Sequence, residues 1–244
     1  MHQPYTTNTL THFVGRADPL DHEGNYGKLS LLLSSSRVSH WPHTDEGERT
    51  GYTIDLSKSL HIGQLIVPTV TCFADIPEES LGIHVQKYGC FGLGFKREFL
   101  IRAGARPVTY VPMFSNEWLY AINGRYLLED IAAIHLGFRN HFKARIAGDG
   151  KPVMRTMKKV PETEDEILRA LKSLLEKEFL AYLKPFNSEL PSDHPENFYR
   201  EREWRKFAYL RFKPTDVERI WVAAGYAGRI VVNFPALASA VTEL

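Results

Sequence analysis

Segments patterned as strands and as helices alternate along this chain without a regular rhythm, and this irregularity constrains the fold more than any other feature. A strand pattern at 9–14 precedes helical spacing at 26–33. Short apolar runs follow at 64–73, and 107–111 is again strand-like. A doubly wound parallel sheet would need strands and helices in strict succession. The sequence therefore predicts an α+β fold in which helices flank a mixed or antiparallel sheet.

The strongest helix signal covers residues 164–183. Thr163 and Glu166 have the spacing of a capping box, in which two side chains satisfy backbone N–H groups at the helix start. Apolar residues recur at helical spacing as Ile167, Leu171, Leu174, Leu175, Phe179 and Tyr182. The pattern predicts an amphipathic helix with one apolar face.

The length of 244 residues fits one large domain or two small ones. We find no internal repeat and no Gly/Ser-rich linker, so we expect a single domain over 1–244. The polar stretch 34–58, rich in His and Thr, is interpreted as a long loop inside this domain.

Composition favours a soluble cytoplasmic protein. The first ten residues lack the basic start and apolar core of a secretory signal. The most hydrophobic uncharged stretch, 59–74, is shorter than the roughly 20 residues of a membrane span. Two cysteines, Cys72 and Cys90, are too few for a disulfide framework or a zinc cluster, so we expect neither, and no bound metal.

The net charge of +1 hides an uneven distribution. Residues 84–160 hold 13 Lys and Arg against 5 Asp and Glu, a surplus of 8 positive charges, and the rest of the chain is acidic. A field of that sign attracts phosphate, dinucleotides or nucleic acid. The alternative is that the basic middle only complements the acidic ends within one domain.

Several segments contain residue types that bind anions or metals. The glycines of 89–94 precede Lys96 and Arg97 at the expected start of a helix, which favours an anion; the alternative is a glycine-containing strand packed closely on its neighbour. His12 is either a satisfied strand histidine or a donor to a ribose or phosphate. The pair at 40 and 43 lacks a third metal ligand, and 149–151 lacks an acidic partner for a metal nuclease.

The segment 197–206 alternates charge around two carboxylates. In an extended chain Glu201 and Glu203 would point to the same side, which raises the pKa of at least one unless cations intervene. Arg200, Arg202 and Arg205 are those cations. The alternative is a solvated edge strand whose charges discourage aggregation, although Trp204 indicates some burial.

These segments together resemble the AbiGi-type abortive phage resistance proteins of bacteria. The likeness is carried by 11–16, 72–77, 84–89, 91–96, 104–111 and 199–205, in order and at similar spacing. The resemblance implies a role in abortive infection, in which an infected cell shuts down before phage can spread. It also implies that the chain is the antitoxin-like half of a two-component system with a toxin partner.

A second, more distant likeness concerns chemistry, because the layout is similar to that of DarT-type ADP-ribosyltransferases. The resemblance implies a transferase-like fold with NAD as substrate. It assigns His12 to the NAD ribose, with Arg16 and Lys96 beside it, and Tyr88 or Phe95 to nicotinamide stacking. It assigns Glu203 to the ribose hydroxyl and Glu201 to the acceptor.

Two functional hypotheses follow. The chain is either a defence component that acts by binding a toxin or nucleic acid, the latter through the basic region 84–160, or an NAD-consuming transferase or glycohydrolase acting on nucleic acid or protein. The enzyme requires His12, Tyr88, Lys96 and Glu203 to converge on one cleft.

Overall fold

The computed structural model describes residues 7–39, 52–54, 66–113, 163–191, 193–194 and 197–244, with 130, 131, 133, 134 and 137 as isolated positions. Contacts divide the chain into two compact units. Unit 1 comprises Met1–Arg49, Val70–Val108 and Ser192–Leu244, and unit 2 comprises Thr50–Thr69 and Thr109–Pro191. The single domain over 1–244 stays a prediction.

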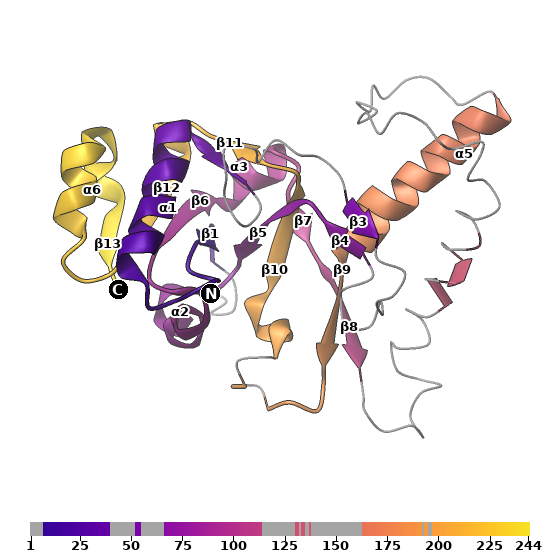
Figure 1. Cartoon of the computed structure of the whole chain (residues 1–244), viewed down its shortest axis with the longest axis horizontal. Helices are drawn as coiled ribbons and strands as arrows, with labels where there is room; N and C mark the ends of the chain where they lie inside the picture. The colour runs from indigo at the N-terminus through magenta and orange to yellow at the C-terminus, as the bar shows by residue number, and fades with distance from the viewer. Residues whose placement is uncertain are drawn as a thin grey trace, which may run out of the picture. The chain divides into compact units, whose positions relative to one another are not determined.

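Unit 1 contains a seven-stranded sheet in the order β13-β12-β6-β1-β5-β10-β7 (Figure 1). Every neighbouring pair is antiparallel except β12 and β13. The strands are β1 Thr9–Phe13, β5 Val70–Ala74, β6 Gly92–Lys96, β7 Arg106–Pro107, β10 Glu203–Phe207, β12 Val217–Val222 and β13 Val241–Glu243. The fold is α+β with a mainly antiparallel sheet flanked by helices, which confirms the predicted fold class.

The glycines of β6 allow its neighbours to approach closely. β1 pairs with β6 from Thr9 opposite Lys96 to Phe13 opposite Gly92. A Cβ on Gly94 would lie 2.7 Å from Cγ2 of Thr9 and 3.0 Å from Cβ of Arg219. This geometry corresponds to the close strand packing that the sequence offered as the alternative to an anion site.

Helices cover both faces of the sheet. α1, His22–Ser35, buries Tyr26, Leu29, Leu32 and Leu33 in the main core, which also contains Phe73, Leu93 and Phe95 from the strands. Asp21 caps this helix by accepting from the N–H of Gly24 at 2.9 Å. A second, smaller cluster of Phe13, Leu81 and Trp221 packs with residues of α2, Gly82–Tyr88. Because side chains alternate along a strand, Leu10 packs into the main core and Phe13 packs into the smaller cluster on the other face.

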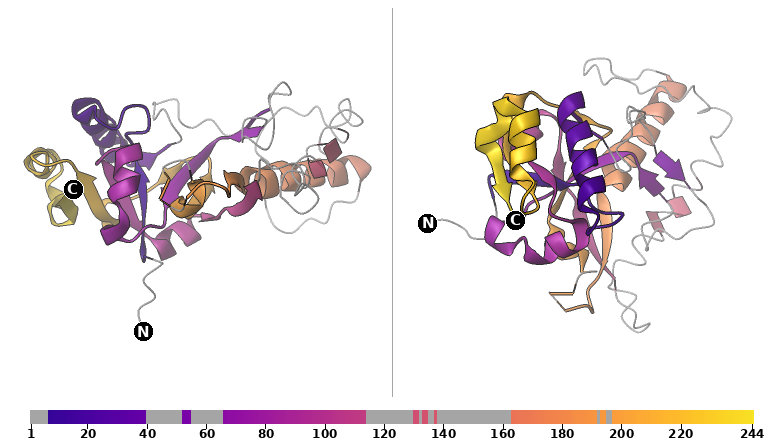
Figure 2. Two further views of the ribbon diagram at one scale, coloured as in Figure 1. Left: turned by 90° about the horizontal axis from the view of Figure 1, so that it is seen from below. Right: turned by 60° about the vertical axis from the view of Figure 1, so that its left-hand side comes forward.

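The remaining helices of unit 1 are short. α3, Arg97–Arg102, follows β6 directly and ends before Gly104, whose φ of 89° only glycine adopts readily. α6, Ala227–Asn233, lies beside α1 (Figures 1 and 2), where Arg229 and Tyr226 both donate to Glu23 at 2.7 Å. Single-turn 3-10 helices occur at Glu78–Ser80, Phe198–Glu201 and Pro214–Asp216, with a longer one at Pro235–Ala240.

Unit 1 also contains a small ladder between β2, Arg37–Val38, and β11, Leu210–Arg211. β2 lies in the stretch 34–58 that was interpreted as a loop, and so does β3, Tyr52–Ile54, of unit 2. That interpretation was wrong at these strands, because short ladders form from long-range pairing that a polar local sequence does not reveal.

Unit 2 pairs β3 with β4, Ile66–Pro68, and pairs β8, Thr109–Met113, in parallel with β9, Leu183–Asn187. The strand expected over 107–111 is therefore two strands, β7 in unit 1 and β8 in unit 2.

The helix expected over 164–183 is shorter than predicted. The capping box of Thr163 and Glu166 is present, and α5 spans Glu164–Ser173. A π-helical turn follows over Leu174–Phe179, then a 3-10 turn over Leu180–Tyr182. The apolar positions Ile167, Leu171, Leu174 and Phe179 are 43–49% exposed, whereas Leu168 and Tyr182 are buried. No helix in the described part of the chain is long and apolar enough to cross a membrane.

Candidate functional site in unit 1

The centre of the candidate site is a hydrogen bond between Tyr88 and Glu201, two residues that are 113 positions apart. Tyr88 ends α2, and its phenol donates to Oε1 of Glu201 at 2.6 Å. Nζ of Lys87 donates to the same oxygen at 2.9 Å and lies 4.0 Å from the ring centroid of Phe198. These two donors therefore come from consecutive residues at one helix end.

Glu203 lies beside this pair. It begins β10 opposite Ala74 of β5, is 5% exposed, and accepts from Nε of Arg205 at 2.5 Å. Because strand residues two apart share a face, Arg205 reaches back to Glu203 along its own strand. The charge of Glu203, like that of Glu201, acts on the Tyr88 phenol.

Arg202 separates the two glutamates in a left-handed conformation, with φ of 44°. A non-glycine residue in this region carries a conformational cost of the order of 1–3 kcal/mol, which the surroundings must offset. The sequence predicted that the two carboxylates lie along one extended strand. In the structure they approach Tyr88 from either side of the turn at Arg202.

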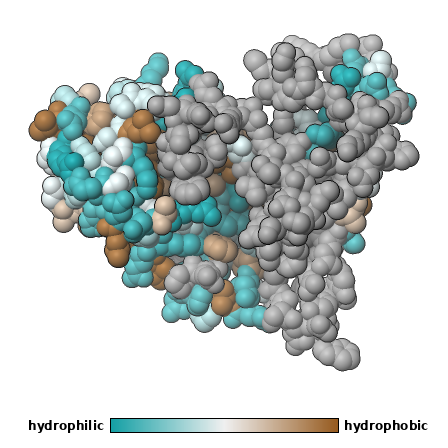
Figure 3. Space-filling model, in the orientation of Figure 1, coloured by the Kyte–Doolittle hydropathy of each residue, from teal (hydrophilic) through white to brown (hydrophobic). Residues whose placement is uncertain are grey.

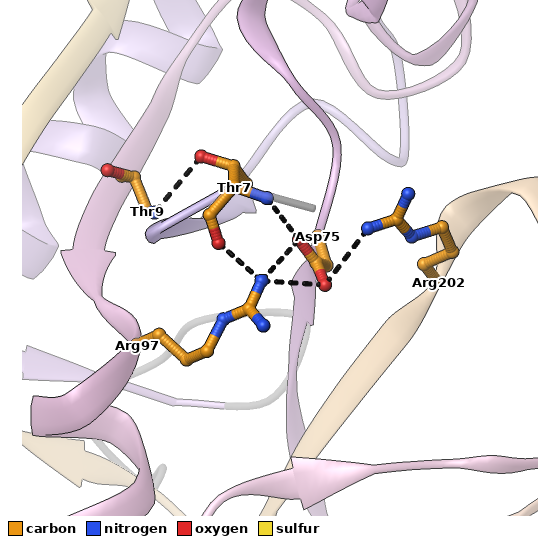
Figure 4. A network of polar contacts seen from close by, with 5 residues as sticks. All are labelled: Thr7, Thr9, Asp75, Arg97 and Arg202. Carbon is orange, nitrogen blue, oxygen red and sulfur yellow. Dashed lines mark hydrogen bonds and ion pairs between the residues drawn. The ribbon is translucent and has the colours of Figure 1, made fainter. Parts of the chain in front are cut away.

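The side chain of Arg202 belongs to a network around Asp75 (Figure 4). Asp75 is 4% exposed, accepts from Nη2 of Arg97 at 2.9 and 3.0 Å, and pairs with Arg202 at 3.2 Å. It also accepts from the backbone N–H of Thr7 at 3.0 Å, while Arg97 donates to the Thr7 carbonyl. One buried carboxylate therefore ties the turn at Arg202 to the start of α3 and to the segment before β1.

Arg16 reaches the site because Gly15 packs on the end of α2. The N–H of Gly15 donates to the carbonyl of Tyr88 at 2.8 Å, and a Cβ at position 15 would lie 2.4 Å from that oxygen. The positive charge of Arg16 acts on the Tyr88 phenol in the direction opposite to the two glutamates. A side chain at position 15, next to Arg16, would therefore collide with the end of α2.

Burial, followed by the negative charges of Glu201 and Glu203, raises the pKa of Tyr88 well above its ordinary value of 10. The phenol therefore stays protonated and acts as a hydrogen-bond donor at neutral pH. The site combines this donor with two carboxylates and the cations Arg16, Lys87 and Arg205. Such a set can hold a polar ligand and stabilise a positive charge that develops next to a carboxylate.

The structure brings four of the predicted site residues together, namely Arg16, Tyr88, Glu201 and Glu203. His12 lies elsewhere: Thr11 and Glu203 both align with Ala74 across the sheet, so His12, one residue on, points to the opposite face. There its Nδ1 donates to the Cys72 carbonyl at 2.7 Å, and burial lowers its pKa to about 4.

The other two predicted binding residues are also apart from Tyr88. Phe95 is fully buried in the main core, in ring contact with Phe73 and Phe212. Lys96 is exposed at the end of β6, opposite Thr9. The sheet therefore does not bring together the four residues that the enzyme hypothesis requires, His12, Tyr88, Lys96 and Glu203. The roles assigned to these residues stay predictions.

Sequence reasoning did not single out Lys87, Asp75 or His84 as site residues. The ring centroid of His84 lies 4.5 Å from the ring centroid of Tyr88 and 4.9 Å from that of Phe13. Asp75 directly follows the apolar strand β5, and a carboxylate at the end of a buried strand was the available clue to a polar network there. In the described ranges no group of three or more His, Cys, Asp or Glu is placed to hold a metal ion. The positions 40, 43 and 149 lie outside the described residues.

The fold and site thus define an α+β protein with a charged, tyrosine-centred cluster at one end of its main sheet. A family model described as "Putative abortive phage resistance protein AbiGi, antitoxin" matches residues 46–222, and the chain belongs to this family. Tyr88, Glu201 and Glu203 lie inside the matched range, whereas His12 and Arg16 precede it. No curated protein and no solved structure matches the chain.

Proposed function

We propose that this protein is the antitoxin-like component of a bacterial abortive-infection system and that it binds a toxin protein through the apolar face of α5. The exposed positions Ile167 and Leu171 of α5, and Leu174 at the start of the π-helical turn that continues it, carry this proposal, since they recur at helical spacing inside the family range. A helix with such a stripe is a common means of docking into an apolar groove of a partner.

The local chemistry of α5 supports a stable docking helix. The capping box at Thr163 satisfies the first N–H groups, and Glu164, Asp165 and Glu166 complement the positive end of the helix dipole. These features stabilise the start of the helix that carries the stripe. Large apolar side chains that are nearly half exposed and contiguous are typical of an interaction surface.

Co-expression tests this proposal. A candidate toxin expressed alone should arrest growth, and co-expression of the wild-type chain should restore growth. The double variant Leu171→Asp, Leu174→Asp should fail to restore it, because two charges would enter the apolar contact. Arg169→Asp places a charge on the opposite side of the same helix and should restore growth like the wild type. Rescue by the double variant would contradict the docking surface.

The convergence of Arg16, Tyr88, Glu201 and Glu203 favours a second candidate, an NAD-consuming transferase or glycohydrolase. In that reaction the bond between nicotinamide and the ribose C1′ breaks, nicotinamide leaves with the bonding electrons, and water or an acceptor hydroxyl adds to C1′ while losing its proton. Glu203 would stabilise the oxocarbenium-like centre, and Glu201 would orient the acceptor. The residues fit only part of NAD, because His12 lies on the other face of the sheet.

Nicotinamide release from NAD by the purified protein tests this second candidate. The wild type should release nicotinamide, and Glu203→Gln should reduce the rate at least a hundredfold while the far-UV circular dichroism spectrum stays unchanged. Glu98→Gln, at an exposed carboxylate of α3, is the matched control and should keep the wild-type rate. No release by the wild type, with and without DNA, would remove the enzyme from consideration.

A further inference from the structure

Cations alternate with aromatic rings along the end of β10 and the start of β11. Cζ of Arg211 lies 5.5 Å from the ring centroid of Tyr209, and Nζ of Lys206 lies 5.9 Å from the same centroid. Trp204 lies earlier on β10, and Cζ of Arg97, the first residue of α3, lies 5.6 Å from its ring centroid. We name these five residues the cation–aromatic row. In Figure 3 unit 1 presents a mainly hydrophilic surface with separate hydrophobic patches.

The corner between the two strands holds Tyr209 in place. Ala208 has a positive φ of 62°, a conformation that costs a non-glycine residue free energy. Its carbonyl accepts a buried hydrogen bond from Oγ1 of Thr71 at 2.6 Å, which fixes the corner to β5. The position of Tyr209 is therefore set by the sheet before any ligand arrives.

Lys206 is a cation of the row that is partly removed from solvent. Its ammonium group is half-buried and donates to the carbonyl of Phe207 at 3.2 Å. Burial lowers its pKa, and within the described residues no carboxylate forms an ion pair with it. A partly desolvated cation gains more from an incoming anion than a fully hydrated one does.

Positive charge extends from the row onto the neighbouring strand. Arg211 of β11 lies directly opposite Arg37 of β2. The register therefore places two arginines side by side at this end of the row. The β2–β11 ladder continues through the N–H of Phe212, which donates to the carbonyl of Ser36 at 3.1 Å, so both arginines stand on hydrogen-bonded backbone.

We propose that the cation–aromatic row, with Arg37, binds single-stranded nucleic acid. Phosphates would contact Lys206, Arg211 and Arg37, and unstacked bases would lie on the rings of Tyr209 and Trp204. Single strands fit better than a duplex because stacking on a protein ring requires bases freed from pairing. An acidic peptide would satisfy the cations but leave the rings without flat partners. The site is independent of the α5 stripe and of the Tyr88 cluster.

Fluorescence anisotropy with the full chain tests this site. Labelled 20-nucleotide oligo(dT) and oligo(U) should bind more tightly than a duplex of equal length, with affinity that falls as salt rises. Lys206→Gln combined with Arg211→Gln should weaken binding at least tenfold and reduce the slope of log K against log salt by about 1.4, since each single-strand phosphate contact contributes about 0.7. Tyr209→Ala should weaken binding about tenfold with an unchanged slope.

Arg219→Gln is the control, because Arg219 is exposed on β12 away from the row, and it should bind like the wild type. Circular dichroism confirms that each variant is folded. Three results would overturn the proposal: no binding of single strands at low salt, equal binding of single strand and duplex, or full affinity in the Lys206 and Arg211 double variant. Stronger competition by poly-glutamate than by unlabelled oligonucleotide would also overturn it, in favour of an acidic protein partner.

Discussion

The phenol of Tyr88 donates a 2.6 Å hydrogen bond to Oε1 of Glu201, and this bond joins the end of α2 to the segment before β10. Lys87 donates to the same oxygen, so the carboxylate is held by one neutral and one charged donor from adjacent residues. The three groups are fixed relative to one another whatever ligand the site binds. Their contribution to stability can therefore be measured separately from function.

Tyr88→Phe should lower the free energy of unfolding by about 1–3 kcal/mol, because a half-buried hydrogen bond to a charged group is lost. Urea denaturation at pH 7 measures this change in the free energy of unfolding. Tyr209→Phe removes a phenol hydroxyl that makes no hydrogen bond to the residues that the structure describes, and it should change stability by less than about 0.5 kcal/mol. Equal effects of the two substitutions would contradict the assigned strength of the Tyr88 bond.

The raised pKa of Tyr88 also predicts a pH dependence. Because the folded-state pKa lies above the ordinary value of 10, the folded chain retains this proton at pH values where the unfolded chain loses it. The stability from this group is complete below pH 10 and is lost as pH rises further. The difference in unfolding free energy between wild type and Tyr88→Phe should therefore shrink between pH 9 and 11. A constant difference across that range would show that the phenol is not perturbed.

Local signals were sufficient to predict parts of this fold from the sequence. The strand at Thr9–Phe13, the helix near Tyr26–Leu33 and the capping box at Thr163 all follow from residues close in sequence. The end of α5 at Ser173 was missed, since the helical spacing of apolar residues continues unchanged through the π-helical turn. Periodicity does not reveal where the backbone changes its hydrogen-bond pattern.

The candidate site was predictable only in part. The sequence suggested that Glu201 and Glu203 act together, and the structure places both near Tyr88, but through a left-handed Arg202 that no local pattern indicates. His12 was grouped with them by order along the chain. Which face of the sheet a strand residue occupies depends on the register of β1 against β5, and this register is set by long-range pairing.

The depressed pKa of His12 should make the protein less stable in mild acid. Its folded-state pKa is about 4, whereas the unfolded value is near 6.5, so only the unfolded chain takes up this proton between these values. The free energy of unfolding should fall by about 3 kcal/mol from pH 7 to pH 4 through this group. His12→Gln should flatten that dependence relative to the wild type, and urea denaturation across this pH range measures both slopes. Identical slopes in the two proteins would contradict a buried neutral His12.

Replacement of Asp75, at the end of β5, should destabilise the protein strongly. Asp75→Asn removes the charge that faces Arg97 and Arg202, leaving two partly buried cations uncompensated. Loss of one partner of a buried ion pair costs about 3–5 kcal/mol. Glu98→Gln removes a carboxylate that lies 3.8 Å from Arg102 on the exposed side of α3, where the expected change is below about 1 kcal/mol. Urea midpoints of the two variants measure the contrast, and a smaller loss for Asp75→Asn than for Glu98→Gln would refute it.

Gly15→Ala should disturb the site without touching any charged residue. The new Cβ would lie 2.4 Å from the Tyr88 carbonyl oxygen, which is backbone and cannot rotate away, so the loop must move. We expect a loss of about 1–3 kcal/mol. Gly27→Ala is the matched control: nothing lies within 4 Å of a Cβ there, and on α1 alanine should stabilise the helix by about 0.5–1 kcal/mol. Thermal melts measure both changes: the melting temperature should fall for Gly15→Ala and rise for Gly27→Ala. Equal melting temperatures would contradict the close approach of Gly15 to the Tyr88 carbonyl.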